Sequence, residues 1–391
     1  MINNFFKEYK IYLIFFSLFL LIYLLNFEAY TFREGTDFRV RYEYYGVKII
    51  NDILNLDFSS NVFLFGQPNH YAFFNSYFIP EIITGVLIYI TPNDYIFGVL
   101  SNLLNMFLLF CSIKIFFNCL KIKNKDMVVL IFFSFFFIYL ANWSWVFWKL
   151  ADIYFLFIFS LIFYLLTKGI ESKKSNYLLF AFFLTCISFI TKPQSLAIIP
   201  FFLFGVLILY FKKFSFLKIL IFLVIIYFLI FPLIVYYTRN YDQGNMLYYF
   251  YKSGNINANI HYHYNDFLNQ FNLLKNNYTE MLYCYFIILK KTIYQITFLR
   301  ESYSLNHNIF LIIYTLILYF FLIINLNYLI SKHNIFFKLT LLIYVFTLLL
   351  HSSLNMSAEP NRTVLFYLIP IYILFSISVE RCLSFFYLKI K

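Results

Sequence analysis

Residues 309–330 read IFLIIYTLILYFFLIINLNYLI, a run of 22 residues without a charged side chain. A helix needs roughly 17–25 mainly apolar residues to cross the hydrocarbon core of a bilayer, so this stretch predicts a transmembrane helix. Nine other apolar segments lead to the same interpretation. The ten predicted spans centre on residues 11–27, 95–117, 127–140, 153–166, 177–190, 196–210, 219–237, 309–330, 339–350 and 364–378.

The composition predicts an all-α polytopic membrane protein and excludes an ordinary soluble globule. Of 391 residues, 62% are hydrophobic and 12% are charged, and the mean hydropathy is +0.76. Soluble domains are about half apolar and a quarter charged. The aromatic fraction of 25% does not by itself indicate a ring-lined site, because Phe, Tyr, Ile, Asn and Lys share A/T-rich codons. The five cysteines lack metal-ligand spacing, and we interpret them as small apolar packing residues.

The net charge of +12 does not indicate nucleic-acid binding, because the Lys and Arg residues lie between the apolar segments. Short cytoplasmic loops of membrane proteins are enriched in these residues. With the N-terminus in the cytoplasm, the predicted inner loops and tail hold Lys121, Lys123, Lys125, Lys168, Lys173, Lys174, Lys212, Lys213, Lys218, Lys332, Lys338, Arg381, Lys389 and Lys391. Each short outer loop then holds one basic residue, namely Lys149, Lys192 or Arg362.

Two apolar pieces, residues 77–90 and 281–299, are ambiguous. A span at 77–90 alone would move every basic cluster up to Lys218 to the outer side, so we expect both pieces to lie at the outer surface or to dip into it. This gives ten spans with both termini in the cytoplasm. Residues 1–391 then form a single membrane domain with two long outer loops, 28–94 and 238–307, and no soluble domain.

The first outer loop carries mixed charges directly after the first helix, in the run Arg33-Glu34-Gly35-Thr36-Asp37-Phe38-Arg39-Val40-Arg41-Tyr42-Glu43. One interpretation is a general base flanked by cations that bind phosphate. The other is a solvated loop whose charges pair with one another. Asp37 is the candidate base, and an ion pair with Arg39 or Arg41 is its structural alternative. Glu34 and Glu43 are alternates, because the sequence does not say which carboxylate points inward.

Other charged residues also fall at predicted outer helix ends, where a charge must be paired or hydrated. Lys192 and Arg362 are each the only basic residue of a short outer loop, so each is either a phosphate ligand or an interfacial side chain. Lys149 lies beside three tryptophans and Asp152, which suggests an interfacial belt or a simple ion pair. The remaining candidate substrate contacts are Tyr42, His70, Tyr71 and Glu359.

The order of these motifs resembles the GT-C superfamily of polytopic glycosyltransferases, including the protein-mannosyltransferase and aminoarabinose-transferase families. The first loop, with Asp37 followed by tyrosines, is similar to that family's first loop. The stretches 66–71, 189–195 and 359–370 resemble its Gly-x-Pro…Tyr, Lys-Pro-x-Ser and Glu-x-x-Arg…Pro patterns. Thr363 replaces the aromatic residue that usually follows the arginine. The first loop also lacks the Asp-x-Asp or Glu-x-Asp pair of metal-dependent members.

The resemblance implies sugar transfer from a polyprenyl-phosphate donor to a glycan, lipid or protein acceptor at the outer face, in cell-envelope polysaccharide biosynthesis. Asp37 would remove the proton of the acceptor hydroxyl, and Lys192 and Arg362 would bind the departing phosphate. We expect no resident cofactor and no nucleic-acid partner; no metal-binding residues are identified, and the sequence leaves a divalent metal requirement open. The A/T-biased composition favours a bacterial inner membrane.

Two other functions fit the composition. An oligosaccharide repeat-unit polymerase would also be a many-span protein, but its key arginines would cluster in two outer loops. Here the second loop has only the separated Arg239 and Arg300. A lipid-saccharide flippase would carry ionisable residues in mid-span and broken helices, whereas only Lys114 stands within a predicted span.

Overall fold

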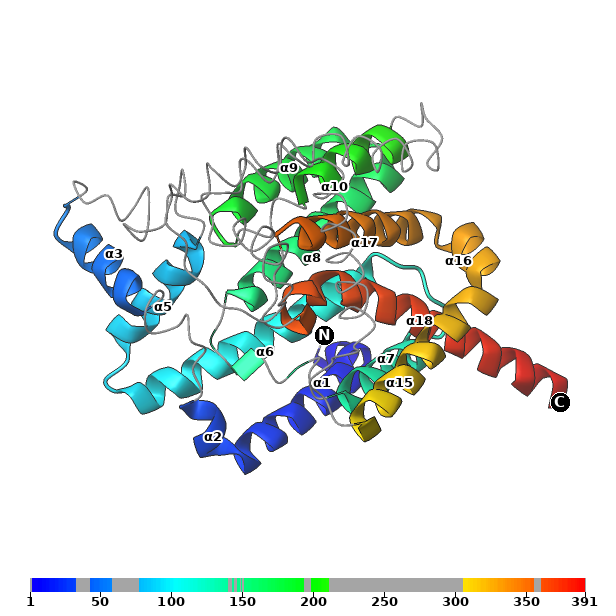
Figure 1. Ribbon diagram of the computed structural model, residues 1–391, viewed down its shortest axis with the longest axis horizontal. Helices are drawn as coiled ribbons and strands as arrows, with labels where there is room; N and C mark the ends of the chain where they lie inside the picture. Colours follow the sequence, from blue (N-terminus) through cyan, green and yellow to red (C-terminus); the bar gives the residue numbers. More distant parts are fainter. Residues whose placement is uncertain are drawn as a thin grey trace, which may run out of the picture.

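The computed structural model describes residues 2–32, 43–57, 77–139, 143, 146, 147, 149, 151–192, 198–210, 305–354 and 360–390. Every regular element within these residues is a helix (Figure 1). In chain order the helices are α1 (Ile2–Leu25), α2 (Phe27–Thr31), α3 (Tyr44–Leu54), α5 (Phe78–Ile90), α6 (Asp94–Asn118), α7 (Lys125–Ile138), α8 (Asp152–Ser172), α9 (Ser175–Phe189), α10 (Ile198–Gly205) with the π-helical turn η5 (Val206–Tyr210), α15 (Leu305–Ile324), α16 (Leu326–Lys332), α17 (Asn334–Leu354) and α18 (Pro360–Ile390).

The all-helical prediction and the membrane assignment are confirmed at this level. The described part contains three helices that are long and apolar enough to cross a membrane, α6, α8 and the 368–385 part of α18. The bent pair α15 and α16 adds a fourth if it forms one span. Helices also cover the other predicted spans, although they are shorter, except for 219–237, which lies outside the described residues. The count of ten spans therefore stays a prediction.

Long helices run back and forth between two ends of the molecule (Figure 1). At one end lie α2, α3, α5 and the first turns of α6 and α8, and we name it the α5 end. At the other lie α16 and the last turns of α6, α8 and α18, and we name it the α16 end. α8 lies between them as a central element that packs on α6, α9 and α18.

Aromatic rings fill the space between the helices. Phe19 of α1 packs edge-on against Trp143, at 5.1 Å between ring centroids, and Phe133 of α7 stacks on Phe15 at 4.7 Å. Near the C-terminal half, Phe135 stacks on Tyr314 at 4.1 Å. Such pairs add about 0.5–1.5 kcal/mol each beyond the burial of their area. The phenylalanine-rich composition therefore has a packing role in this fold.

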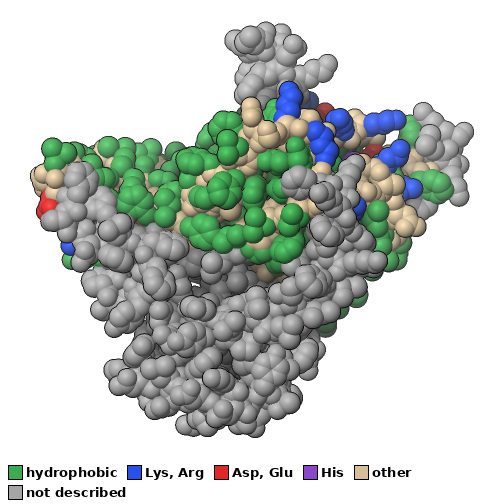
Figure 2. Space-filling view, turned by 90° about the horizontal axis from the view of Figure 1, so that it is seen from above, with side chains coloured by type: hydrophobic (Ala, Val, Ile, Leu, Met, Phe, Trp, Pro, Cys, Tyr) green, Lys and Arg blue, Asp and Glu red, His purple; other side chains and the backbone are tan. Residues whose placement is uncertain are grey.

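Basic side chains gather at the α16 end, where Figure 2 shows Lys and Arg close together on one part of the surface. They belong to the turn after α6, the last turn of α8, the α8–α9 turn, α16, the start of α17 and the C-terminal part of α18. The positions predicted from sequence to be cytoplasmic thus lie together in space wherever the structure describes them.

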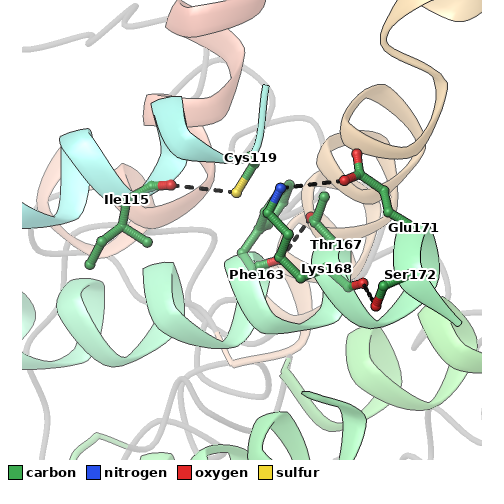
Figure 3. A network of polar contacts seen from close by, with 7 residues as sticks. All are labelled: Ile115, Cys119, Phe163, Thr167, Lys168, Glu171 and Ser172. Atoms are coloured by element: carbon green, nitrogen blue, oxygen red, sulfur yellow. Dashed lines mark hydrogen bonds and ion pairs between the residues drawn. The ribbon is translucent and has the colours of Figure 1, made fainter. Parts of the chain in front are cut away.

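Figure 3 shows how polar groups are satisfied at the α16 end. Lys168 and Glu171 form a partly exposed ion pair of 3.4 Å one turn apart on α8, while Thr167 donates to the carbonyl of Phe163 at 2.8 Å. Cys119, which follows the last turn of α6, is buried, and this burial raises the pKa of its thiol. A protonated, buried thiol is a packing group rather than a nucleophile.

Candidate functional site

A buried ion pair lies at the α5 end, between α8 and the residues that follow α9. The ammonium of Lys192 donates to Oδ1 of Asp152, and each side chain is only 5% exposed. Asp152 is the first residue of α8, where the positive end of the helix dipole stabilises a carboxylate. Because an isolated charge is costly in this environment, removal of either residue would leave the other as an unpaired buried group.

Lys149 is also buried at the α5 end and is 5% exposed. Its backbone has a φ of 53°, in the left-handed region that lysine rarely adopts. Its ammonium donates to the carbonyl oxygen of Thr31 at 2.9 Å and lies 5.4 Å from the centre of the Phe97 ring. Thr31 is the last residue of α2, so the cation faces the negative end of that short helix.

The end of α2 is docked tightly on α6. The hydroxyls of Tyr23 and Thr31 share a hydrogen bond of 2.8 Å, and Asn102 donates to the carbonyl of Tyr30 at 3.0 Å. A side chain at Gly98 would place its Cβ 2.4 Å from the carbonyl oxygen of Thr31. This contact allows no side chain at position 98. Thr31, two residues before the segment 33–42, is thereby held close to Lys149.

Two asparagines of α6 extend this polar region into the bundle. Asn105 donates to the carbonyl of Val146 at 2.9 Å, in the same loop as Lys149. Asn102 and Asn105 are at most 1% exposed, and their side-chain oxygens accept no hydrogen bond from the described part of the chain. Buried acceptors of this kind are usually satisfied by ordered water or a ligand donor.

The surface helix α5 completes the α5 end. The backbone amide of Ile79 donates to the carbonyl of Ile190 at 3.0 Å, which ties the start of α5 to the turn that carries Lys192. Glu81 in the first turn of α5 is 2% exposed. Glu81 and the two asparagines were missed as site candidates, although polar side chains within apolar segments are a recognisable signal.

The structure brings together Lys149, Asp152 and Lys192 at one end of the bundle, and it pairs Asp152 with Lys192. Glu43, a predicted alternate base, lies directly before α3 and lines an open cavity of about 670 Å³ together with Tyr44, Val47, Lys48, Asn51 and Asp52. The predicted residues Glu34, Asp37, Tyr42, His70, Tyr71 and Glu359 lie outside the described residues.

Arg362 lies in the first turn of α18, and its side chain is not among those described. Glu380 comes 18 residues later on the same helix, about 27 Å along the axis at ~1.5 Å per residue. Glu380 accepts from Asn124 at the α16 end, at 2.6 Å. The turn that carries Arg362 therefore lies away from the α16 end.

Within the described residues, no group of three or more His, Cys, Asp or Glu side chains is arranged to hold a metal ion. The described part of the α5 end offers two buried ammonium groups, one buried aspartate, one buried glutamate and buried amide oxygens. Ammonium groups can bind anions, and buried amide oxygens can accept hydrogen bonds from hydroxyl groups. Comparisons with known proteins give no match to a family, to a curated protein or to a solved structure.

Proposed function

We propose that this protein is a membrane glycosyltransferase that moves a sugar from a polyprenyl-phosphate donor to an acceptor at the outer face of a bacterial inner membrane. The observation that carries the proposal is the burial of Lys149, Asp152 and Lys192 together at one end of an apolar helix bundle. Ionisable groups in such places are costly, and they mark functional sites more often than other positions do.

The hydrogen bond from Lys149 to Thr31 links this cluster to the segment that carries the proposed base. Asp37 follows Thr31 by six residues, so the chain keeps the two within about 21 Å of each other. Arg362 belongs to the first turn of α18, about 27 Å along that helix from Glu380 at the α16 end. In the proposed site, residues from four distant parts of the sequence surround one substrate.

In the proposed reaction, the carboxylate of Asp37 removes the proton from an acceptor hydroxyl. The resulting oxygen attacks the anomeric carbon, and the bond from that carbon to the donor phosphate oxygen breaks. Polyprenyl phosphate leaves with both electrons of that bond, held by Lys192 and Arg362, and the anomeric configuration inverts. Because the ammonium of Lys192 is paired with Asp152, a donor phosphate must either displace the Asp152 carboxylate or share the ammonium with it.

The proposed topology has ten spans, both termini in the cytoplasm and the α5 end outside. Two observations support it. The basic residues gather at the α16 end, as expected for a cytoplasmic side (Figure 2). The chain also reaches Tyr210 at the α16 end, where it contacts Lys173. It resumes in α15 beside the far end of α7, where the rings of Phe310 and Tyr139 are 6.5 Å apart, whereas α7 begins beside Glu380 at the α16 end. One span at 219–237 accounts for that change of end.

A reconstituted transfer assay with purified protein and a panel of polyprenyl-phosphate sugars tests the function. We expect transfer or slow donor hydrolysis by wild type, loss of at least 100-fold in kcat for Asp37→Asn, and a raised donor KM for Lys192→Gln. Lys174→Gln, an exposed cation at the α16 end, is the matched control and should behave as wild type.

Other outcomes would replace the proposal. Full activity of Asp37→Asn would remove the assigned base. Chain growth from diphosphate-linked oligosaccharides, without activity on monophosphate donors, would identify a repeat-unit polymerase. Movement of a labelled lipid-linked saccharide across the bilayer without any transfer would identify a flippase.

A further inference from the structure

A cavity lies among the C-terminal helices, and none of the residues that line it belongs to the cluster of Lys149, Asp152 and Lys192. The cavity of about 160 Å³ opens between α15, α16, α17 and α18. Its walls include Tyr319, Leu326, Phe337, Leu341 and Leu374. The lining is almost entirely hydrocarbon, so the cavity suits an apolar chain and disfavours a sugar or an ion.

The cavity exists because α15 and α16 diverge by 60°. Asn325 lies at the break, and its side-chain amide donates to the carbonyl of Phe321 on α15 and to that of Ser378 on α18, each at 3.2 Å. These bonds fasten the bend to α18. The gap is therefore a built feature of the fold.

The polar side chains on the cavity wall already form hydrogen bonds within the protein. Tyr319 and Tyr344 are joined by a hydrogen bond between their side chains. Thr340 donates its hydroxyl to the carbonyl of Phe336 at 2.8 Å. Since these hydroxyls already have partners, the wall presents methyl, methylene and ring surfaces to an occupant.

Three of the helices that form the cavity carry basic side chains near the α16 end. Lys332 closes α16 about 9 Å beyond Leu326 along the helix, and Lys338 directly follows Phe337 on α17. Arg381 lies about 10 Å beyond Leu374 on α18, and its guanidinium stacks 4.0 Å above the Tyr328 ring. The neighbouring carboxylate of Glu380 accepts from Asn124 and Ser384.

We propose that this cavity binds one acyl chain of an anionic phospholipid, whose phosphate lies against Lys332, Lys338 and Arg381. The apolar wall selects the chain, and the cations select the head-group charge. The site does not depend on the proposed glycosyltransferase activity, since the basic cluster and the Lys192–Asp152 pair lie at opposite ends.

The test measures lipid binding by full-length protein purified in detergent. Native mass spectrometry counts retained lipids after addition of phosphatidylglycerol or of phosphatidylcholine with the same chains. We expect at least 10-fold preferential retention of phosphatidylglycerol by wild type. Lys332→Gln combined with Lys338→Gln should abolish the preference, and Leu341→Trp should reduce retention of both lipids by filling the cavity.

Two control variants show whether loss of any cation or addition of any Trp ring changes lipid retention. Lys174→Gln removes an exposed cation from the same end, and Leu179→Trp adds the same ring to an α9 position that is 67% exposed. Neither control should alter retention. Equal retention of the two lipids by wild type, or unchanged retention in Leu341→Trp, would overturn the proposal.

A second measurement does not depend on filling the cavity. Phe337→Trp places an indole on the wall with little change in shape, and phosphatidylglycerol with brominated chains should quench its added fluorescence. Quenching no stronger than that of an indole at position 179 would contradict a bound chain in the cavity.

Discussion

At the scale of single residues, the Lys192–Asp152 pair dominates the energetics of the α5 end. Both side chains are almost wholly buried, so neither charge can be hydrated if its partner is removed. Removal of one member of such a pair typically costs about 3–5 kcal/mol, whereas replacement of both is far milder. The Lys168–Glu171 pair at the α16 end is partly exposed and contributes about 0.2–0.5 kcal/mol.

This difference gives a prediction for unfolding in mixed micelles. Lys192→Gln and Asp152→Asn should each lower the free energy of unfolding by about 3–5 kcal/mol. The double variant should lose clearly less than the sum, because no buried charge remains. Lys168→Gln is the control, with a loss below about 0.5 kcal/mol. Additive losses in the double variant would show that the two side chains do not interact.

The sequence selected three of these site residues but could not assign their partners. Lys149 and Asp152 are near in sequence, which suggests a pair, yet the structure pairs Asp152 with Lys192 and directs the Lys149 ammonium to Thr31. These partners are 40 and 118 residues apart, a separation that local patterns do not encode. Asn102 was overlooked because one amide barely lowers the hydropathy of a long apolar segment.

At the scale of helices, α3 and α5 form a closely packed pair beside the bundle. Their backbones touch at two glycines, where a Cβ on Gly85 would lie 2.3 Å from the carbonyl oxygen of Gly46. Tyr45, Ile49, Phe78 and Ile82 surround this contact. The atoms that a Cβ would meet here are mainly backbone atoms, which cannot move aside as the end of a flexible side chain can. The close contact between α3 and α5 therefore requires glycine at both positions.

Gly85→Ala should therefore separate α3 from α5 and cost about 1–3 kcal/mol of local stability. Amide hydrogen exchange in α3 should accelerate roughly 5- to 100-fold, while α6 and α8 stay protected. Gly169→Ala is the matched control, since its Cβ would meet the flexible end of the Leu178 side chain. Unchanged exchange in α3 would mean that the helices can adjust to the added methyl.

Helix positions were largely predictable, because apolar length alone marks a membrane helix. The break between α15 and α16 could not be predicted from the sequence. Residues 309–330 form one apolar run without Gly or Pro, and it predicts a single straight helix. The structure bends it at Asn325, whose amide contacts α18 as well as its own helix. A tertiary hydrogen bond therefore decides a feature that the local sequence does not mark.

At the scale of the whole molecule, the distribution of charge predicts the orientation in the membrane. Lysines at the α16 end favour a cytoplasmic position for that end. We expect a cysteine at Pro92, in the exposed turn between α5 and α6, to react with an impermeant maleimide on intact cells. A cysteine at Lys174 should react only after permeabilisation. The background should lack the five native cysteines, and the reverse pattern would overturn the proposed orientation.

The Lys192–Asp152 pair also bears on how the chain enters the membrane during synthesis. The two residues close the open end of the hairpin formed by α8 and α9, so both charges belong to one pair of consecutive helices. Once residue 192 has been made, this hairpin carries its own counter-ion at its open end, which is the translocated end in the proposed topology. The buried charges at this end can therefore neutralise each other before any later helix exists to shield them.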